Sequence, residues 1–243
     1  MLSDKRYNKL NYLKILNILK ISDTRKYDIF KLLQSKNIFF RKPRRLWSPI
    51  SLLNNKNVLI VAPGDSVVKY RKLLEKFILK NNVYVICLNT ASTISSSLIN
   101  LRVACNPHRI RSDTFFHSNS KKDLAIPVST MPKKVYDLIK VKNKKIFNYG
   151  LSIQPKYSIV IKNNYCVLPK PLATAYALAI AISGKVNQVF LAGFDGYKID
   201  DPTNDETNQI FKILKKKCNK KFLISLTPTK YNIEYKSVSS LKL

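Results

Sequence analysis

The fold is decided by residues 57–67, NVLIVAPGDSV. The β-rich apolar run predicts a buried strand, and the Pro-Gly pair predicts a tight turn. A helix should follow, because apolar side chains recur with helical spacing at Val67, Tyr70, Leu74, Phe77 and Ile78. Asp65 and Ser66 are good N-cap residues for it. The stretch therefore predicts a strand–turn–helix unit, as found in open α/β sheets.

The end of this strand is a candidate ligand site. In an open α/β sheet, ligands bind at the carboxyl ends of the strands, where a helix N-terminus favours anions. The turn contains one glycine, Gly64, so neither GxGxxG nor GxxxxGK[ST] is present. Asp65 would repel a phosphate placed on the turn and fits a ribose hydroxyl better. The alternative is an ordinary βα turn capped by Asp65.

Strand-like and helix-like runs alternate along the rest of the chain. The helix over 172–183 is apolar on almost every face, as expected of a helix buried against a sheet. The pattern predicts a Rossmann-like α/β domain over 46–243, with a mostly parallel sheet and helices on both faces. The other expected strands are 83–88, 101–105, 124–128, 188–192 and 222–226, with a hairpin over 157–161 and 165–168 and further helices over 132–139 and 204–217.

Residues 1–45 form a basic segment of different character. Apolar residues at helical spacing predict two short helices, over 12–19 and 27–33, and the basic run RKPRR at 41–45 precedes Trp47. A basic amphipathic segment near a tryptophan could lie on an anionic membrane surface. The alternative is a helical appendage packed on the domain and joined to it by a solvated linker.

The net charge of +30 favours anionic partners, whether nucleic acid, an acidic membrane surface or phosphorylated substrates. Lysine greatly outnumbers arginine, and asparagine and isoleucine are also abundant, which indicates that biased codon usage raises the lysine count everywhere. No face combines arginine with aromatic residues, so specific nucleic-acid binding is not expected.

The cysteine spacing and the hydropathy further limit the class of protein. The four cysteines show no metal-ligand spacing, so reduced thiols and no zinc site are expected. The chain shows no signal peptide and no run of the ~18–20 apolar residues needed to span a bilayer. We therefore expect a cytoplasmic protein, peripheral at most to the inner face of the membrane.

Polar residues follow each predicted parallel strand and should meet at one edge of the sheet. Asn89 and Asn106 both donate and accept hydrogen bonds, which suits a nucleotide base or sugar hydroxyls, and Arg109 could neutralise a phosphate. The full candidate set is Gly64, Asp65, Ser66, Asn89, Asn106, His108, Arg109, Asp195 and Tyr197.

Two of these residues could act as a general base. His108 stands beside Arg109 and Arg111, which favour the neutral imidazole, although a surface histidine is the alternative. Asp195 could accept a proton, orient a sugar hydroxyl or merely fix its turn. The acidic residues of 200–206 could hold Mg²⁺ or compensate the dipole of the following helix.

Several segments resemble the bacterial family 42 sialyltransferases, which use CMP-activated sialic acid. Residues 58–67 resemble the family's IIAGNGPSL, 87–89 its CNQ, 105–107 its YNP, and 189–197 (VFLAGFDGY) its IYLSGIDFY. The resemblance covers roughly 57–229. It implies a CMP-sugar donor and no other cofactor, with Gly64, Ser66, Asn89 and Asn106 around CMP and Asp195 and Tyr197 beside the transferred sugar.

The chain departs from that family after Tyr197. The family's catalytic histidine lies in a lid that follows this strand, whereas no histidine follows His117 here. The chain is more similar still to a C-terminal extension of aldolase-like proteins in surface-polysaccharide gene clusters, where equivalents of 44–47, 104–108 and 191–197 recur together. That resemblance implies an aldolase-like partner.

Three functions follow from these observations. The first is a glycosyltransferase of surface-polysaccharide biosynthesis, with His108 or Asp195 deprotonating the acceptor, which could be lipid-linked. The second is a non-catalytic module that binds a nucleotide sugar or a partner through residues 1–45. The third is a Mg²⁺-dependent pyrophosphokinase-like phosphotransferase that uses residues 200–206.

Overall fold

The computed structural model describes residues 46–91, 93–131, 133–140, 144–153, 159–197, 201–218 and 222–241. The expected helical segment over 1–45 lies outside the described residues, as do Tyr157 of the expected hairpin and Asp200 of the acidic cluster. Across the described ranges, no helix is both long enough and apolar enough to cross a membrane.

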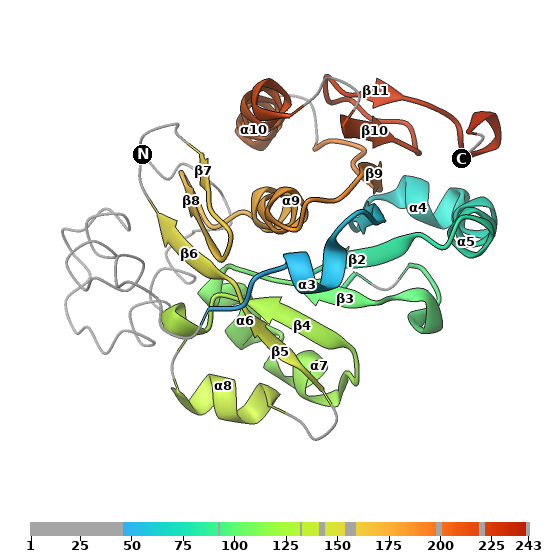
Figure 1. The fold of residues 1–243 in the computed structure, drawn as a ribbon. Helices are drawn as coiled ribbons and strands as arrows, with labels where there is room; N and C mark the ends of the chain where they lie inside the picture. The colour runs from blue at the N-terminus through green and yellow to red at the C-terminus, as the bar shows by residue number, and fades with distance from the viewer. Residues whose placement is uncertain are drawn as a thin grey trace.

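Eight parallel strands form the main sheet (Figure 1). Their spatial order is β11-β10-β9-β1-β2-β3-β4-β5, so the chain runs outward from β1 and returns on the other side of it through β9. Ligands of open α/β sheets bind where the strand order reverses in this way, here between β1 and β9. The strands are β1 (Asn57–Val61), β2 (Tyr84–Leu88), β3 (Leu101–Val103), β4 (Asp123–Ile126), β5 (Ile146–Asn148), β9 (Gln188–Ala192), β10 (Leu223–Ser225) and β11 (Glu234–Tyr235).

A second, three-stranded sheet covers part of the first. It consists of β6 (Gly150–Ile153), β8 (Tyr165–Leu168) and β7 (Val160–Ile161), with β6 parallel and β7 antiparallel to β8. Helix α9 (Ala173–Ser183) lies between the two sheets, in contact with β2 and β3 on one side and β7 and β8 on the other. Its residues from Ala175 to Ala181 are all buried, which explains an apolar sequence on every face.

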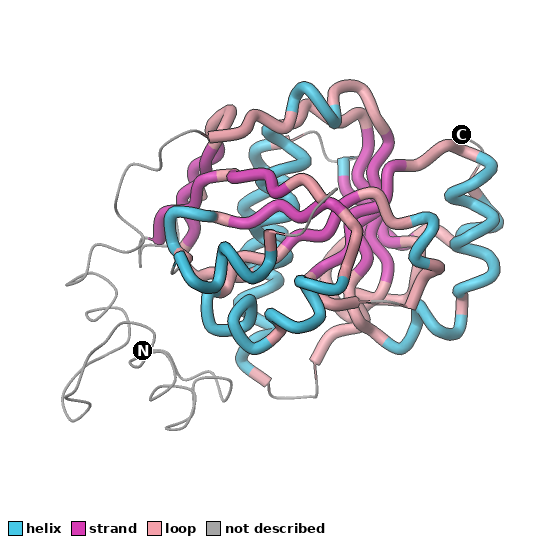
Figure 2. Tube along the Cα trace, turned by 90° about the horizontal axis from the view of Figure 1, so that it is seen from below, coloured by secondary structure: helices cyan, strands magenta, loops and turns pink. Residues whose placement is uncertain are grey.

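Helices cover both faces of the main sheet (Figure 2). On one face, Val58 and Ile60 of β1 share a core with α3, α9 and α10. On the other face, Leu59 and Val61 pack with α4 and α5, and β4 packs with α6 and α8. The bounds are α3 (Ile50–Leu53), α4 (Asp65–Lys69), α5 (Arg71–Lys80), α6 (Pro107–Ser112), α7 (Thr114–Asn119), α8 (Lys133–Ile139) and α10 (Pro202–Lys217), with 3-10 turns η2 (Ser96–Leu98), η3 (Val128–Thr130) and η5 (Val238–Ser240). The predicted Rossmann-like α/β fold is confirmed.

The structure corrects several local predictions. The N-cap of α4 is Gly64, which is extended, while Asp65 and Ser66 lie in the first turn. The N–H of Ser66 is satisfied by the Asp195 carboxylate, so no local side chain is needed as a cap. The single helix expected after the turn is divided into α4 and α5, because Tyr70 departs from the helical conformation, with φ −101°. The expected hairpin is confirmed for its described residues by the antiparallel pairing of β7 with β8, and it forms part of the second sheet. The side chain of Trp47 stacks on Phe147, with 4.4 Å between ring centroids, so packing within the domain accounts for it.

Candidate functional site

A cavity of about 490 Å³ opens at the carboxyl edge of the main sheet, beyond the ends of β1, β2, β3 and β9. Four of the five strand ends expected at this edge contribute to it. The fifth, with Thr227 and Thr229 after the strand over 222–226, does not line it, and the Thr227 hydroxyl oxygen accepts a hydrogen bond from the Gly193 N–H instead. Of the predicted site residues, all but Asp65 and Ser66 line this cavity: Gly64, Asn89, Asn106, His108, Arg109, Asp195 and Tyr197.

The Asp195 carboxylate occupies the N-terminus of α4. The Ser66 backbone N–H donates to one carboxylate oxygen at 2.8 Å, and the Ser66 hydroxyl donates to the other. A carboxylate at this position satisfies an orphan N–H group and complements the helix dipole. The start of α4, a position that favours anions, is therefore taken by the protein's own side chain, which comes from the loop after β9.

Two glycines allow the loops after β1 and β9 to pack against each other. A Cβ on Gly64 would lie 2.4 Å from the Gly193 carbonyl oxygen and 2.7 Å from the Asp195 carboxyl carbon. Gly193 has φ +77°, and a Cβ there would lie 2.3 Å from the Ala62 carbonyl oxygen. No other residue fits these positions without backbone movement. The two glycines thus allow Asp195 to lie against α4 at the wall of the cavity.

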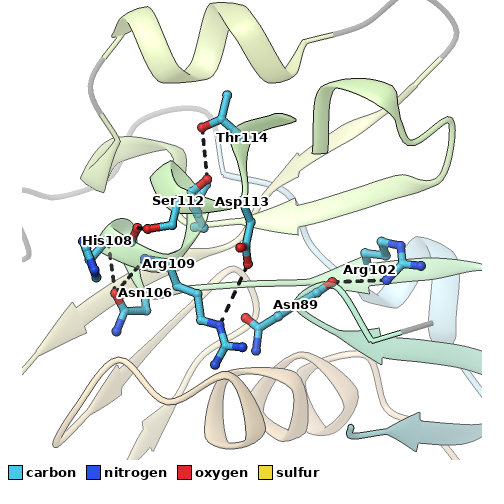
Figure 3. Close-up of polar contacts among 9 residues, drawn as sticks. Asn89, Arg102, Asn106, His108, Arg109, Ser112, Asp113 and Thr114 are labelled. Carbon is cyan, nitrogen blue, oxygen red and sulfur yellow. Dashed lines mark hydrogen bonds and ion pairs between the residues drawn. The ribbon is translucent and has the colours of Figure 1, made fainter. Parts of the chain in front are cut away.

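Asn106 and His108 lie at the start of α6 (Figure 3). The Asn106 side-chain oxygen accepts hydrogen bonds from the backbone N–H groups of His108 and Arg109, at 3.0 and 3.3 Å. This is an N-cap, and Pro107 follows it at the first helical position. The side-chain oxygen of Asn106 is therefore engaged by the helix, although both ends of the amide were expected to serve a ligand.

Arg102 is a positioning residue that the sequence analysis does not name. It lies on β3, is buried, and donates through Nη1 to the carbonyl oxygens of Asn89 and Ala91, at 3.2 and 2.7 Å. Asn89 itself has φ +51°, a left-handed conformation that asparagine tolerates better than most residues. Arg102 therefore holds the turn that presents Asn89 to the cavity. The sequence feature that could have identified Arg102 is a cationic residue between two apolar residues of a predicted buried strand.

The cations of the cavity are paired with carboxylates. The Arg109 Nε atom lies 3.9 Å from an Asp113 carboxylate oxygen, and Lys170 forms an ion pair with Glu206 of α10. Burial raises the pKa of the Asp113 carboxyl, and the nearby Arg109 and His108 partly offset this. Asp113 and Lys170 both line the cavity, and neither is among the predicted site residues. A phosphate would compete with Asp113 for Arg109.

The acidic segment after β9 is used for local structure. The Asn204 side-chain oxygen accepts a hydrogen bond from the Tyr197 backbone N–H at 2.8 Å, which ties the loop after β9 to α10. Glu206 pairs with Lys170. Among the residues that the structure describes, no group of three or more histidine, cysteine, aspartate or glutamate side chains is placed to hold a metal ion.

Comparisons with known proteins support the fold. No family model and no curated protein matches the chain. The structure is similar to that of the MAf glycosyltransferase from Magnetospirillum magneticum AMB-1, with a TM-score of 0.59 and 14% sequence identity, over 82% of this chain and 36% of that chain. The chain thus spans about a third of the length of that protein. The likeness is one of fold and does not single out the family 42 sialyltransferases, so that resemblance stays a prediction.

Proposed function

We propose that the protein binds a nucleotide sugar in the cavity at the carboxyl edge of the main sheet and transfers its sugar, with a CMP-activated acidic sugar as donor. The observation that carries the proposal is the convergence of four strand ends on one cavity. Its volume, about 490 Å³, lies within the range of small-molecule sites. The fold shared with a glycosyltransferase agrees with this chemistry. A role in surface-polysaccharide biosynthesis, with a lipid-linked acceptor, belongs to the same proposal.

The residues would divide into a nucleotide side and a sugar side. Asn89 and Asn106 would contact the nucleotide, with Arg109 near its phosphate. Tyr197, 40% exposed at the rim, would lie beside the sugar. His108 is favoured as base over Asp195, because the Asp195 carboxylate already accepts two hydrogen bonds from Ser66.

The reaction would be a direct displacement. The acceptor oxygen forms its bond to the anomeric carbon while the bond from that carbon to the CMP phosphate oxygen breaks. The proton of the acceptor hydroxyl passes to His108, and CMP leaves as the anion.

The test is binding of CMP by thermal shift. CMP should raise the melting temperature, and Asn89→Ala should abolish the rise. Asn119→Ala is the matched control, because Asn119 is exposed and does not line the cavity. Absence of any shift with CMP, CMP-sugars or other nucleotides would refute the proposal.

The second candidate is a non-catalytic module that binds the nucleotide sugar. The pairing of Arg109 with Asp113 and of Asp195 with Ser66 favours it, because both charged groups already have protein partners. A catalytic protein should hydrolyse or transfer the donor, and His108→Ala should lower turnover while CMP still binds. A module should bind CMP equally well with and without His108 and release no sugar. Loss of capture of an aldolase-like protein on deletion of 1–45 would support the partner role.

A Mg²⁺-dependent phosphotransferase has less support. Glu206, one of its expected ligands, is engaged by Lys170. Binding of ATP that requires Mg²⁺ and is lost in Asp201→Asn would favour this function over the other two.

A further inference from the structure

The outer face of α4 and α5 combines exposed apolar side chains with lysines. Val68, Leu73 and Leu79 are 61%, 48% and 69% exposed. We define the α4–α5 face as these three residues together with four exposed lysines of the same helices: Lys69, Lys72, Lys76 and Lys80.

Helical spacing places these side chains on one side. The hydrogen bonds from Tyr70 N–H to the Ser66 carbonyl and from Leu74 N–H to the Tyr70 carbonyl, 2.9 and 3.0 Å, carry the four-residue repeat across the junction of the two helices. Lys72, Lys76 and Leu79 then form one row and Lys69, Leu73, Lys76 and Lys80 the next, at spacings of three and four residues. The buried residues Val67, Leu74, Phe77 and Ile78 face the sheet on the opposite side.

The positive charge of this face is offset only in part by its own helices, because Asp65 lies four residues before Lys69 in α4 and Glu75 lies in α5. Glu75 is the acidic residue of α5, and its carboxylate accepts hydrogen bonds from Arg71 Nε and from the Ser95 backbone N–H. Within the described ranges, Lys69, Lys72, Lys76 and Lys80 form no ion pair. An occupant of this face should therefore be anionic and should also offer an apolar layer.

We propose that the α4–α5 face docks the protein on a bilayer that contains anionic lipids. The lysine ammonium groups would lie among the lipid headgroups, and Val68, Leu73 and Leu79 would reach the boundary of the acyl chains. The interleaved apolar side chains favour a bilayer over nucleic acid, whose phosphate surface offers no apolar layer. The proposal does not depend on the activity of the cavity.

The first test is co-sedimentation of the full chain with vesicles of phosphatidylcholine, with and without phosphatidylglycerol. Wild type should bind the anionic vesicles. Lys72→Gln/Lys76→Gln/Lys80→Gln should bind them about a hundredfold more weakly, because each lysine near an anionic surface contributes roughly fivefold. The control removes equal charge elsewhere, as Lys212→Gln/Lys216→Gln/Lys230→Gln; two of these lysines lie on α10, which covers the opposite face of the sheet. It should stay within about threefold of wild type, since its lysines lie off the α4–α5 face.

A second variant tests the apolar part. Leu73→Gln/Leu79→Gln keeps every charge and a good helix propensity, and should weaken binding about tenfold. Circular dichroism and melting temperature establish that each variant is folded. Equal losses in the lysine variant and its control would overturn the proposal in favour of unspecific charge. Unchanged binding by the leucine variant would also overturn it, in favour of a purely electrostatic surface suited to nucleic acid.

Discussion

A buried group of cations beside β3 should make the protein lose stability on mild acidification. His117 is 1% exposed, and neither ring nitrogen has a hydrogen-bond partner among the described residues. The Arg102 guanidinium lies 4.8 Å from the ring centroid of Phe116, and Lys144 Nζ donates to the His117 backbone carbonyl. Burial, together with Lys144 and Arg102, lowers the pKa of His117 to about 4.

The sign of the effect follows from proton binding. A histidine of the unfolded chain has a pKa of about 6.5, so the unfolded chain binds a proton between pH 6.5 and 4 that the folded protein does not bind. Above pH 6.5, protonation of His117 therefore does not lower the free energy of unfolding. As the pH falls from 6.5 to 4, that free energy decreases. Between pH 7.5 and 4.5 the loss amounts to about 2.5 kcal/mol. The same surroundings lower the pKa of Lys144 to about 8, so its protonation changes stability only above the tested range.

The assay is urea unfolding at pH 7.5 and 4.5. The free energy of unfolding of wild type should fall by about 2.5 kcal/mol more than that of His117→Leu, which keeps an apolar side chain in the site and cannot titrate. Phe116→Leu is the control, because it changes the packing beside the same Arg102 guanidinium without removing a titratable group. It should keep the wild-type loss. Equal losses of unfolding free energy in wild type and His117→Leu would refute the conclusion that His117 is buried and neutral.

Three further substitutions test the site. Gly64→Ala places a Cβ 2.4 Å from the Gly193 carbonyl oxygen and should lower the free energy of unfolding by about 2–3 kcal/mol in urea; a loss below about 0.5 kcal/mol would show that the loops can separate freely. Asp195→Asn weakens the hydrogen bonds from Ser66 and should cost about 1–2 kcal/mol by calorimetry, with an unchanged value speaking against the cap. Arg102→Met frees the turn after β2 and should weaken CMP binding about tenfold in titration calorimetry, whereas equal affinity would contradict its positioning role.

The long elements could be read from the sequence because each follows its own hydrophobic pattern. The strand over 188–192 and the buried helix before it have the predicted type and nearly the predicted bounds. The strands β5, β6 and β11 were not predicted. Asn148 and Gly150 interrupt the apolar run that contains β5 and β6, and β11 consists of two exposed residues, Glu234 and Tyr235. The membership of β8 in a second sheet depends on its pairing with β6, which no local pattern encodes.

The sequence by itself determined that Gly64, Asn89, Asn106 and Asp195 would meet, because parallel strands end at a common edge. Only the tertiary structure decided how their polar atoms are used. Asp195 accepts from Ser66, which is distant along the chain, and Arg102 holds the turn of Asn89 from the neighbouring strand. Hydrogen bonds between distant segments depend on how the strand ends come together in space, and residue type and local spacing do not carry that information.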